Sequence, residues 1–307
     1  KDLDLRLGEF FSDKIEEFIA SLSLKKEKIE AIGSHGQTIK HEPNSIPPFS
    51  LQIGNPQFIS NKLGIKTIAN FRDDDIAKGG QGAPLSPIFH KEVFAKENKK
   101  RVIINIGGIT NISLLGGPKL IGFDTGPGNC LLDIWTKKNK KGNYDNEGNW
   151  AKAGTVDQDL LDIMMKDNYF SLEPPKSTGP DYFNLSWLQD CLMKLKREID
   201  PRDTQATLVE LTASSLSNSL QRLKIVNENI YICGGGVHNK FLMRRISSLL
   251  GEKCYTTDKL GLDPDYIEAI CFAWLAYKRV NNIKFNMSAI TGSNEKVFLG
   301  KVYLPTK

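Results

Sequence analysis

The sequence predicts an α/β fold, and three observations lead to this prediction. Short apolar segments typical of strands alternate with amphipathic helical segments along most of the chain. Glycine-rich turns join a strand to a helix at two places, residues 124–129 and 234–239. The length of 307 residues is enough for two domains of about 150 residues each.

The N-terminal elements begin with an amphipathic helix from Leu3 to Leu22. Apolar residues recur three and four positions apart along it, so we expect one face to pack on a core. A short strand at residues 29–33 then ends in the loop 33–38. The segments that follow read as one βαβ unit, made of a strand at 50–53, a helix capped by Asn55 with Pro56 at its first position, and a strand at 65–71.

The C-terminal elements follow a charged stretch at residues 96–101, which is the best candidate for a domain boundary. We therefore expect domains at residues 1–98 and 99–307, with the last helix and the tail packing back on the first domain. The remaining elements are a β-meander, a mainly helical region and a second strand–turn–helix unit, with strands at 102–106, 110–115, 120–123 and 230–233 and helices at 239–250 and 264–279.

Composition excludes several classes of protein. The net charge of +5 is too small for an extended nucleic-acid footprint, and 40% hydrophobic with 25% charged residues is typical of a folded soluble protein. No apolar run approaches the roughly 20 residues that span a bilayer, and the first residues do not resemble a signal peptide. The five cysteines and four histidines lack metal-site spacing. We expect a cytoplasmic protein with no nucleic-acid or membrane partner and no built-in metal site.

The first glycine turn, Asp124 to Asn129, follows an apolar strand and precedes a helix. Backbone amides and the positive end of such a helix can hold phosphate, while Gly126 and Gly128 permit close approach. Asp124 would then lie beside the reacting group. The alternative is a tight turn in which the aspartate only caps the helix.

The second glycine turn, Gly234–Gly236, also joins a strand to a helix and leaves room for a flat ligand such as an adenine or a ribose. One alternative is a purely structural turn. Another is a dinucleotide fold, in which Gly234 and Gly236 open the helix and Asp258 ends the next apolar segment about 20 residues later. A Walker-type phosphate loop is excluded, because no glycine is followed by Lys-Ser or Lys-Thr in the required arrangement.

Polar side chains gather on loops near the predicted strand ends, where open α/β sheets bind ligands. They are His35, Thr38, Arg72, Asp75 and Gln81. Taken singly, each could equally be a solvated surface group. Glu268 interrupts the apolar face of the final helix near its N-terminus, so it is either a site residue or a helix-end charge.

Seven short strings occur in order along nearly the whole chain: GSHGQT (33–38), QIGNP (52–56), GGQGAP (79–84), NIGGITNISLL (105–115), GFDTGPGN (122–129), STG (177–179) and CGGGVHN (233–239). Together they resemble the anhydro-N-acetylmuramic acid kinase family. The resemblance implies a two-domain actin-like ATPase fold of ribonuclease H-like type, with ATP and sugar meeting in a cleft between the domains.

The resemblance also implies the reaction. The enzyme would consume ATP and water, open 1,6-anhydro-N-acetylmuramic acid and place a phosphate on O6, giving N-acetylmuramic acid 6-phosphate in peptidoglycan recycling. Mg²⁺ would arrive with the nucleotide, and relatives suggest a homodimer. Non-catalytic binding of a sugar or nucleotide is the alternative.

Site residues follow from the same resemblance, motif by motif. Asp124 matches the aspartate that activates water, and Glu268 matches a glutamate at the sugar. His35, Thr38, Arg72 and Gln81 lie in strings on the substrate side. The residues expected to face the nucleotide are Gly107, Gly108, Asn111, Gly126, Gly128, Asn129, Gly234, Gly235, Gly236 and Asn239.

One family feature does not occur within residues 1–307. It is the N-terminal strand with a Gly-Thr-Ser-x-Asp-Gly hairpin, which should hold the β- and γ-phosphates. We expect an upstream segment to supply it, because otherwise the sheet of the first domain would lack its central partner. The alternative is a protein that has lost efficient use of ATP.

Overall fold

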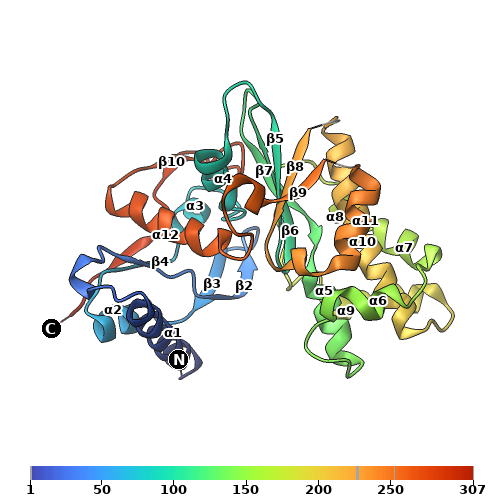
Figure 1. Cartoon of the computed structure of the whole chain (residues 1–307), viewed down its shortest axis with the longest axis horizontal. Helices are drawn as coiled ribbons and strands as arrows, with labels where there is room; N and C mark the ends of the chain where they lie inside the picture. Colours follow the sequence, from blue (N-terminus) through green and yellow to red (C-terminus); the bar gives the residue numbers. More distant parts are fainter. Residues whose placement is uncertain (1, 226–227, 252, 307) are drawn as a thin grey trace. The chain divides into compact units, whose positions relative to one another are not determined.

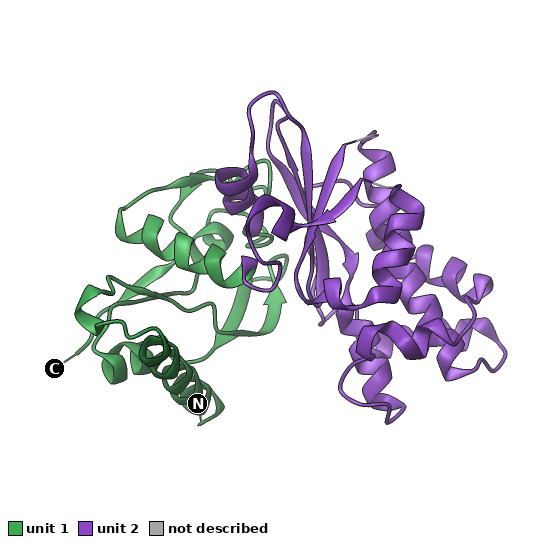
Figure 2. Cartoon of the chain, in the orientation of Figure 1, with its two compact units in different colours: residues 1–85, 268–307 green, residues 86–267 purple. Residues whose placement is uncertain are grey.

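The computed structural model describes residues 2–225, 228–251 and 253–306. They form two compact units: Lys1–Leu85 with Glu268–Lys307, and Ser86–Ile267, which Figure 2 shows in different colours. We call them unit 1 and unit 2. The sequence analysis placed a boundary after residue 98, whereas here helix α4 (Ser86–Phe94) belongs to unit 2. The reason is packing: α4 lies against strand β6, where buried His90 contacts Ser113.

Unit 2 is built on a five-stranded sheet in the order β7-β6-β5-β8-β9. Strand β6 pairs antiparallel with both β5 and β7, and β8 pairs parallel with both β5 and β9. The first three strands therefore form the expected meander. The strand bounds are Arg101–Ile106 (β5), Ile109–Leu115 (β6), Ile121–Pro127 (β7), Asn229–Cys233 (β8) and Cys254–Thr256 (β9).

This strand order identifies the fold class. Numbered along unit 2, the order is 3-2-1-4-5 with the second strand antiparallel to its neighbours, which is the ribonuclease H-like sheet. The expected α/β fold of actin-like ATPase type is therefore confirmed. The dinucleotide alternative is wrong. That fold requires parallel strands joined by helical crossovers, whereas β5, β6 and β7 are antiparallel and follow one another through short turns.

Helices of unit 2 pack on this sheet around one large core (Figure 1). Helix α10 is buried along most of its length and contacts β7, α5, α6, α7 and α11. The helix bounds are Asn129–Lys138 (α5), Asn149–Lys152 (α6), Gln158–Met165 (α7), Asn168–Ser171 (α8), Leu185–Leu195 (α9), Pro201–Arg222 (α10) and Lys240–Leu250 (α11).

Unit 1 contains a three-stranded sheet in the order β1-β4-β12, together with two small antiparallel pairs, β2-β3 and β10-β11. Its strands are Ile32–Gly33 (β1), Gln37–Glu42 (β2), Phe49–Ile53 (β3), Thr67–Ala69 (β4), Phe285–Asn286 (β10), Lys296–Val297 (β11) and Lys301–Tyr303 (β12). Its helices are Asp2–Ser21 (α1), Pro56–Leu63 (α2), Asp73–Ala77 (α3) and Ile267–Val280 (α12), the last beginning at the boundary between the units.

Residues 268–307 complete unit 1. Strand β12 pairs antiparallel with β4, so the end of the chain adds the third strand of the sheet. Helix α12 lies so close to β1 that a Cβ on Gly33 would stand 2.4 Å from the carbonyl oxygen of Phe272. Glycine at position 33 is therefore what allows the strand to approach this helix.

The structure corrects the expected βαβ unit. The segments on either side of α2 do not share a sheet: β3 pairs antiparallel with β2, while β4 pairs parallel with β1. Local alternation of apolar and polar residues predicts a strand but not its partner. The expected cap of α2 is present, since the Asn55 side chain accepts a hydrogen bond from the Phe58 amide at 2.8 Å.

Four further expectations about local structure are wrong. Asp124 and Gly126 lie within β7 and not in the loop after it, and Thr38 lies in β2. Asp75 lies in α3, where it is fully buried and not solvated. On α1, Phe10 and Phe18 are exposed, whereas Gly8 and Ser12 form part of the buried side because small residues allow α2 to approach. Among the described helices, none is both long and apolar enough to cross a bilayer.

Candidate functional site

Asp124 is held at the edge of the unit 2 sheet by a neighbouring chain segment. It stands opposite Asn111 in the register of β6 and β7 and is only 4% exposed. Its backbone amide donates to the Lys176 carbonyl at 3.3 Å, and the Thr178 amide donates to its Oδ2 at 3.0 Å. The Tyr169 hydroxyl donates to its backbone carbonyl at 2.7 Å. A buried carboxylate oriented in this way has the chemistry of a general base.

The Gly107–Gly108 turn packs directly on the start of α5. The amides of Gly128 and Asn129 donate to the Gly108 and Gly107 carbonyls at 2.9 Å each, and the Cys130 amide donates to Gly108 at 3.1 Å. A Cβ on Gly128 would stand 2.4 Å from the Gly107 oxygen. These three amides are engaged inside unit 2, so a phosphate bound to them would have to displace the turn.

The three glycines of the Gly234–Gly236 turn have different surroundings. Gly234 has a φ of +83°, in the region that favours glycine. A Cβ on Gly236 would stand 2.2 Å from Cγ2 of Ile106, whereas nothing lies within 4 Å of a Cβ on Gly235. Gly236 therefore serves packing, while Gly235 borders open space.

That open space is a cavity of about 580 Å³ between the first turn of α5, the loop 144–147 and the segment 235–240. Its volume lies within the range of about 300–1,000 Å³ that is usual for small-molecule sites. Of the residues expected to face the nucleotide, Asn129, Gly235 and Asn239 line it. The other expected nucleotide residues do not line it: Gly107, Gly108, Asn111, Gly126, Gly128, Gly234 and Gly236.

Most polar groups of the cavity wall already have partners. Asn239 caps α11 by accepting from the Leu242 amide at 3.0 Å, and Lys240 pairs with Glu147 at 2.5 Å. Both carboxylate oxygens of Asp145 accept from backbone amides at 2.9 Å. Burial raises the pKa of Asp133, opposed by the charge of Lys137. The wall therefore offers fixed dipoles and apolar surface, which suit a flat heterocycle.

Unit 1 has its own polar cluster around Arg72. Its Nη1 donates to the Gly82 carbonyl at 2.6 Å, and its Nη2 donates to Nε2 of His35 at 2.9 Å. Nδ1–H of His35 donates to the Gly36 carbonyl at 3.0 Å, which fixes the neutral tautomer. Burial, together with the charge of Arg72, lowers the pKa of His35 to about 3. The imidazole is therefore a neutral acceptor that orients the guanidinium.

The remaining expected substrate residues lie around this cluster in unit 1. The Thr38 hydroxyl accepts from Gln52 at 3.2 Å, and the Gln81 side chain donates to Asn44 at 3.1 Å. Glu268 is exposed in the first turn of α12, so it does not interrupt the buried face of that helix. It lies one turn before Phe272, whose ring centroid is 4.4 Å from that of His35. Helix α12 thus brings Glu268 to the side of the unit that carries His35.

Metal ligands are not gathered in this structure. No group of three or more His, Cys, Asp or Glu side chains within the described ranges is arranged to hold a metal ion. Asp75 is satisfied by protein donors, the Thr291 hydroxyl at 2.8 Å and the Gly82 amide at 2.7 Å, and its burial raises its pKa.

Comparison with known protein families identifies the family of this chain. A family model described as anhydro-N-acetylmuramic acid kinase matches residues 1–305. The chain belongs to the anhydro-N-acetylmuramic acid kinase family. The matched residues span both units.

Curated members of the anhydro-N-acetylmuramic acid kinase family are similar along nearly the whole chain. The protein of that name from Pasteurella multocida is 47% identical over 305 residues, covering 98% of this chain and 81% of the relative. Those from Coxiella burnetii and Shewanella baltica are 43% and 45% identical, covering 98% and 97% of this chain and 82% and 81% of the relatives.

Among solved structures, the activator of 2-hydroxyisocaproyl-CoA dehydratase from Clostridium difficile aligns with a TM-score of 0.36 and 18% identity, over 66% of this chain and 70% of that one. This similarity is too weak to assign a fold, which rests on the strand order of unit 2 described above.

Sequence reasoning missed several residues of the unit 2 site. Tyr169 and Lys176 carry no sequence pattern that links them to Asp124, from which they are separated by more than 40 residues. Thr178 lay within the STG string of the kinase family, which was the one available signal. The loop 144–147 at the cavity has no motif at all, because its contribution depends on how it folds over α5.

Proposed function

We propose that this chain is an ATP-dependent kinase that hydrolytically opens 1,6-anhydro-N-acetylmuramic acid and phosphorylates its O6. The products are N-acetylmuramic acid 6-phosphate and ADP. The single observation that carries the proposal is the family match over residues 1–305, with relatives of that name at 43–47% identity. Cytoplasmic peptidoglycan recycling and a homodimeric state belong to the same proposal.

Asp124 is the proposed base. Its carboxylate takes a proton from water, whose oxygen attacks the anomeric carbon of the sugar. The bond from that carbon to O6 breaks and its electron pair passes to O6, which attacks the γ-phosphorus of ATP. The bond from that phosphorus to the oxygen shared with the β-phosphate breaks, and ADP leaves with that electron pair. The Thr178 amide supports this role, because its hydrogen bond to Oδ2 fixes the orientation of the carboxylate.

The cavity beside Gly235 is the proposed site of the adenine. Its volume, its apolar residues Leu132 and Val237, and the open space at Gly235 support this assignment. Mg²⁺ would be carried by the phosphates of the nucleotide, where it would neutralise charge during phosphoryl transfer. Gly107, Gly108, Gly126 and Gly128 would lie on the phosphate side of this site, without use of the amides of residues 128–130, which already donate to the Gly107–Gly108 turn.

The arginine cluster of unit 1 is the proposed sugar side. Arg72, fixed by His35 and the Gly82 carbonyl, presents a guanidinium suited to an anionic group, such as the lactyl carboxylate of the sugar. Thr38, Gln81 and Glu268 would supply hydroxyl-directed hydrogen bonds around it. Glu268 has the further role of orienting the attacking water or a sugar hydroxyl.

The test is turnover of the anhydro-sugar, with ATP and Mg²⁺, by the protein that includes the expected upstream segment, followed by mass spectrometry of the product. A phosphorylated, ring-opened sugar is expected. We expect Asp124→Asn to lower kcat by about 10²–10⁴-fold, the usual contribution of a general base. Asparagine retains an acceptor for the Thr178 amide, so the thermal unfolding of this variant should match that of the unsubstituted chain.

A matched control is Asp190→Asn, because Asp190 is exposed on α9. Its activity should be unchanged. With the upstream segment present, sugar binding by calorimetry without any product would instead favour the non-catalytic alternative, and absence of both binding and product would refute the proposed function.

A further inference from the structure

Lys176 is a buried lysine that the proposed reaction does not use. Only 5% of it is exposed, and within the described residues its Nζ forms no ion pair with a carboxylate. A lysine placed in this way is unusual, because burying an ammonium without a partner is unfavourable. The ammonium is therefore stabilised by something other than an opposite charge in contact.

Aromatic rings and a carbonyl provide that stabilisation. The Lys176 ammonium donates to the Tyr169 carbonyl at 3.1 Å. It also lies over the Tyr169 ring at 4.6 Å from the centroid and near the Phe123 ring at 5.8 Å. Cation–π contacts of this kind strengthen when water is excluded. Phe123 directly precedes Asp124 in β7, so the ammonium is anchored beside the proposed base.

These contacts close a ring of hydrogen bonds around Asp124. The Tyr169 hydroxyl donates to the Asp124 carbonyl, and the Tyr169 carbonyl accepts from Lys176 Nζ. The Lys176 carbonyl accepts from the Asp124 amide, and two residues later the Thr178 amide donates to Asp124 Oδ2. The side chain of Lys176 thus ties the segment that holds the carboxylate to α8.

We propose that Lys176 is a positioning residue for Asp124: its ammonium fixes the segment 176–178 whose Thr178 amide orients the carboxylate. The expected effect of Lys176 on turnover rests on the proposed function. The positioning of the Asp124 carboxylate by the segment 176–178 rests on the hydrogen bonds alone. Lys176 touches no reacting atom in this scheme, so it acts through the Thr178 amide.

The charge state of Lys176 gives this role a pH signature. Burial, reinforced by the charge of Arg222 on α10 and opposed by Glu173 and Asp124, lowers the pKa of Lys176 to about 8. Tyr169 also faces it, with a pKa raised by burial, and so remains neutral over this range. Above a pH of about 8 the neutral amine loses the cation–π attraction, and we expect it to hold the segment 176–178 less firmly.

The experiment compares Lys176→Met, which keeps the length and removes the charge, with Lys176→Arg, which keeps the charge at every pH. We expect Lys176→Met to lower kcat about 10²-fold, the effect of a small misplacement of a catalytic group, with the KM for ATP within about twofold. Lys176→Arg should retain more activity and lose the alkaline decline of kcat near a pH of 8. Lys194→Met, on the exposed face of α9, is the matched control.

A second measurement does not depend on turnover. Hydrogen exchange of the Thr178 amide, followed by NMR, should accelerate about tenfold or more in Lys176→Met. In the unsubstituted chain it should lose protection between pH 7 and 9 beyond the intrinsic rise in exchange rate. The inference would be overturned if the exchange rate of the Thr178 amide changed neither in Lys176→Met nor, beyond the intrinsic rise, between pH 7 and 9 in the unsubstituted chain. Accelerated exchange in a chain without kinase activity would uphold the positioning of Asp124 and refute only the proposed function.

Discussion

Gly235 and Gly236 are adjacent in the sequence but have different surroundings. A side chain on Gly236 would collide with Ile106 of β5, whereas a side chain on Gly235 would enter the cavity of unit 2. Neither has a positive φ, so only space distinguishes them. We therefore expect substitution of Gly236 to affect stability and substitution of Gly235 to affect ligand binding.

We expect Gly236→Ala to lower the free energy of unfolding by about 1–3 kcal/mol, because its methyl group overpacks against Ile106. Gly235→Ala should be nearly neutral in stability. Gly235→Leu should remain folded and raise the KM for ATP about tenfold, which is about 1.4 kcal/mol of binding free energy. Urea unfolding and steady-state kinetics check both; equal stability of the two alanine variants would contradict the packing argument.

For single residues, the sequence indicated the candidate catalytic aspartate but not the residues that hydrogen-bond to it or to its neighbours. Asp124 was singled out because its string, GFDTGPGN, resembles that of the kinase family; the turn alone left a purely structural explanation open, and the role of Asp124 stays a prediction. Lys176 and Tyr169 were not singled out, because their connection to Asp124 exists only after β7, α8 and the segment 176–178 have come together. Long-range hydrogen bonds leave no periodic pattern in the chain.

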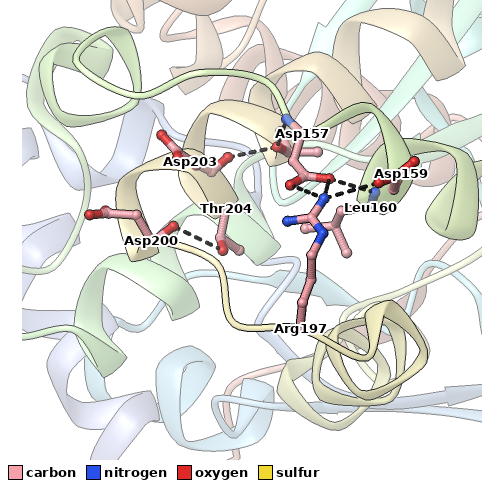
Figure 3. A network of polar contacts seen from close by, with 8 residues as sticks. Asp157, Asp159, Leu160, Arg197, Asp200, Asp203 and Thr204 are labelled. Carbon is pink, nitrogen blue, oxygen red and sulfur yellow. Dashed lines mark hydrogen bonds and ion pairs between the residues drawn. The ribbon is translucent and has the colours of Figure 1, made fainter.

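Helix α7 illustrates the element scale. Figure 3 shows Arg197 between Asp157 and Asp159 at the start of this helix. Asp157 is its N-cap and accepts from the Leu160 amide at 3.0 Å, with 11% of its side chain exposed. Asp159 is 75% exposed and bonds only the arginine among the contacts shown. The two aspartates share one partner but only one of them begins the helix.

We expect Asp157→Ala to lower the free energy of unfolding of unit 2 by about 1 kcal/mol or more, the usual effect of losing an N-cap. Asp159→Ala should change it little, since an exposed ion pair contributes little to stability. Thermal unfolding of both variants at low and high salt checks this. If the two alanine variants were equally destabilised, the ion pair and not the cap would be the main contribution.

Elements with strong local signals were predictable and those fixed by tertiary pairing were not. The meander strands β5 and β6 were recognisable from alternation between glycine turns, as was α11 after its turn. Strands β2 and β10–β12 were not predicted, and most of these span only two or three residues. Strand β3 was found but given the wrong partner, because β2 was unknown.

At the scale of the whole molecule, buried neutral histidines couple stability to pH. His90 is fully buried, with Nδ1 2.8 Å from the Ser113 hydroxyl, and burial lowers its pKa to about 3. Burial and the charge of Arg72 likewise lower the pKa values of His35 to about 3 and of His41 to about 4. In the unfolded chain each histidine titrates near a pH of 6.5.

Because these folded-state pKa values lie below the unfolded value, the unfolded chain binds more protons as the pH falls. Their stabilisation is complete above a pH of 6.5 and is lost progressively toward pH 3. We expect His90→Gln to reduce the slope of unfolding free energy between pH 6 and 5 by about 1 kcal/mol per pH unit. The exposed His238→Gln is the control, and urea unfolding at both pH values is the measurement. Identical slopes for His90→Gln and the unsubstituted chain would show that His90 is not the source.

The group that donates to the Asp124 carboxylate is the main-chain amide of Thr178, so most substitutions of the Thr178 side chain do not remove this hydrogen bond. Every residue except proline carries that N–H group, so replacing the Thr178 side chain by alanine leaves the bond to the carboxylate in place. Alanine scanning would consequently report position 178 as unimportant. Only proline at position 178 would remove the donor itself, so Thr178→Pro and Thr178→Ala together distinguish the role of the amide from that of the side chain.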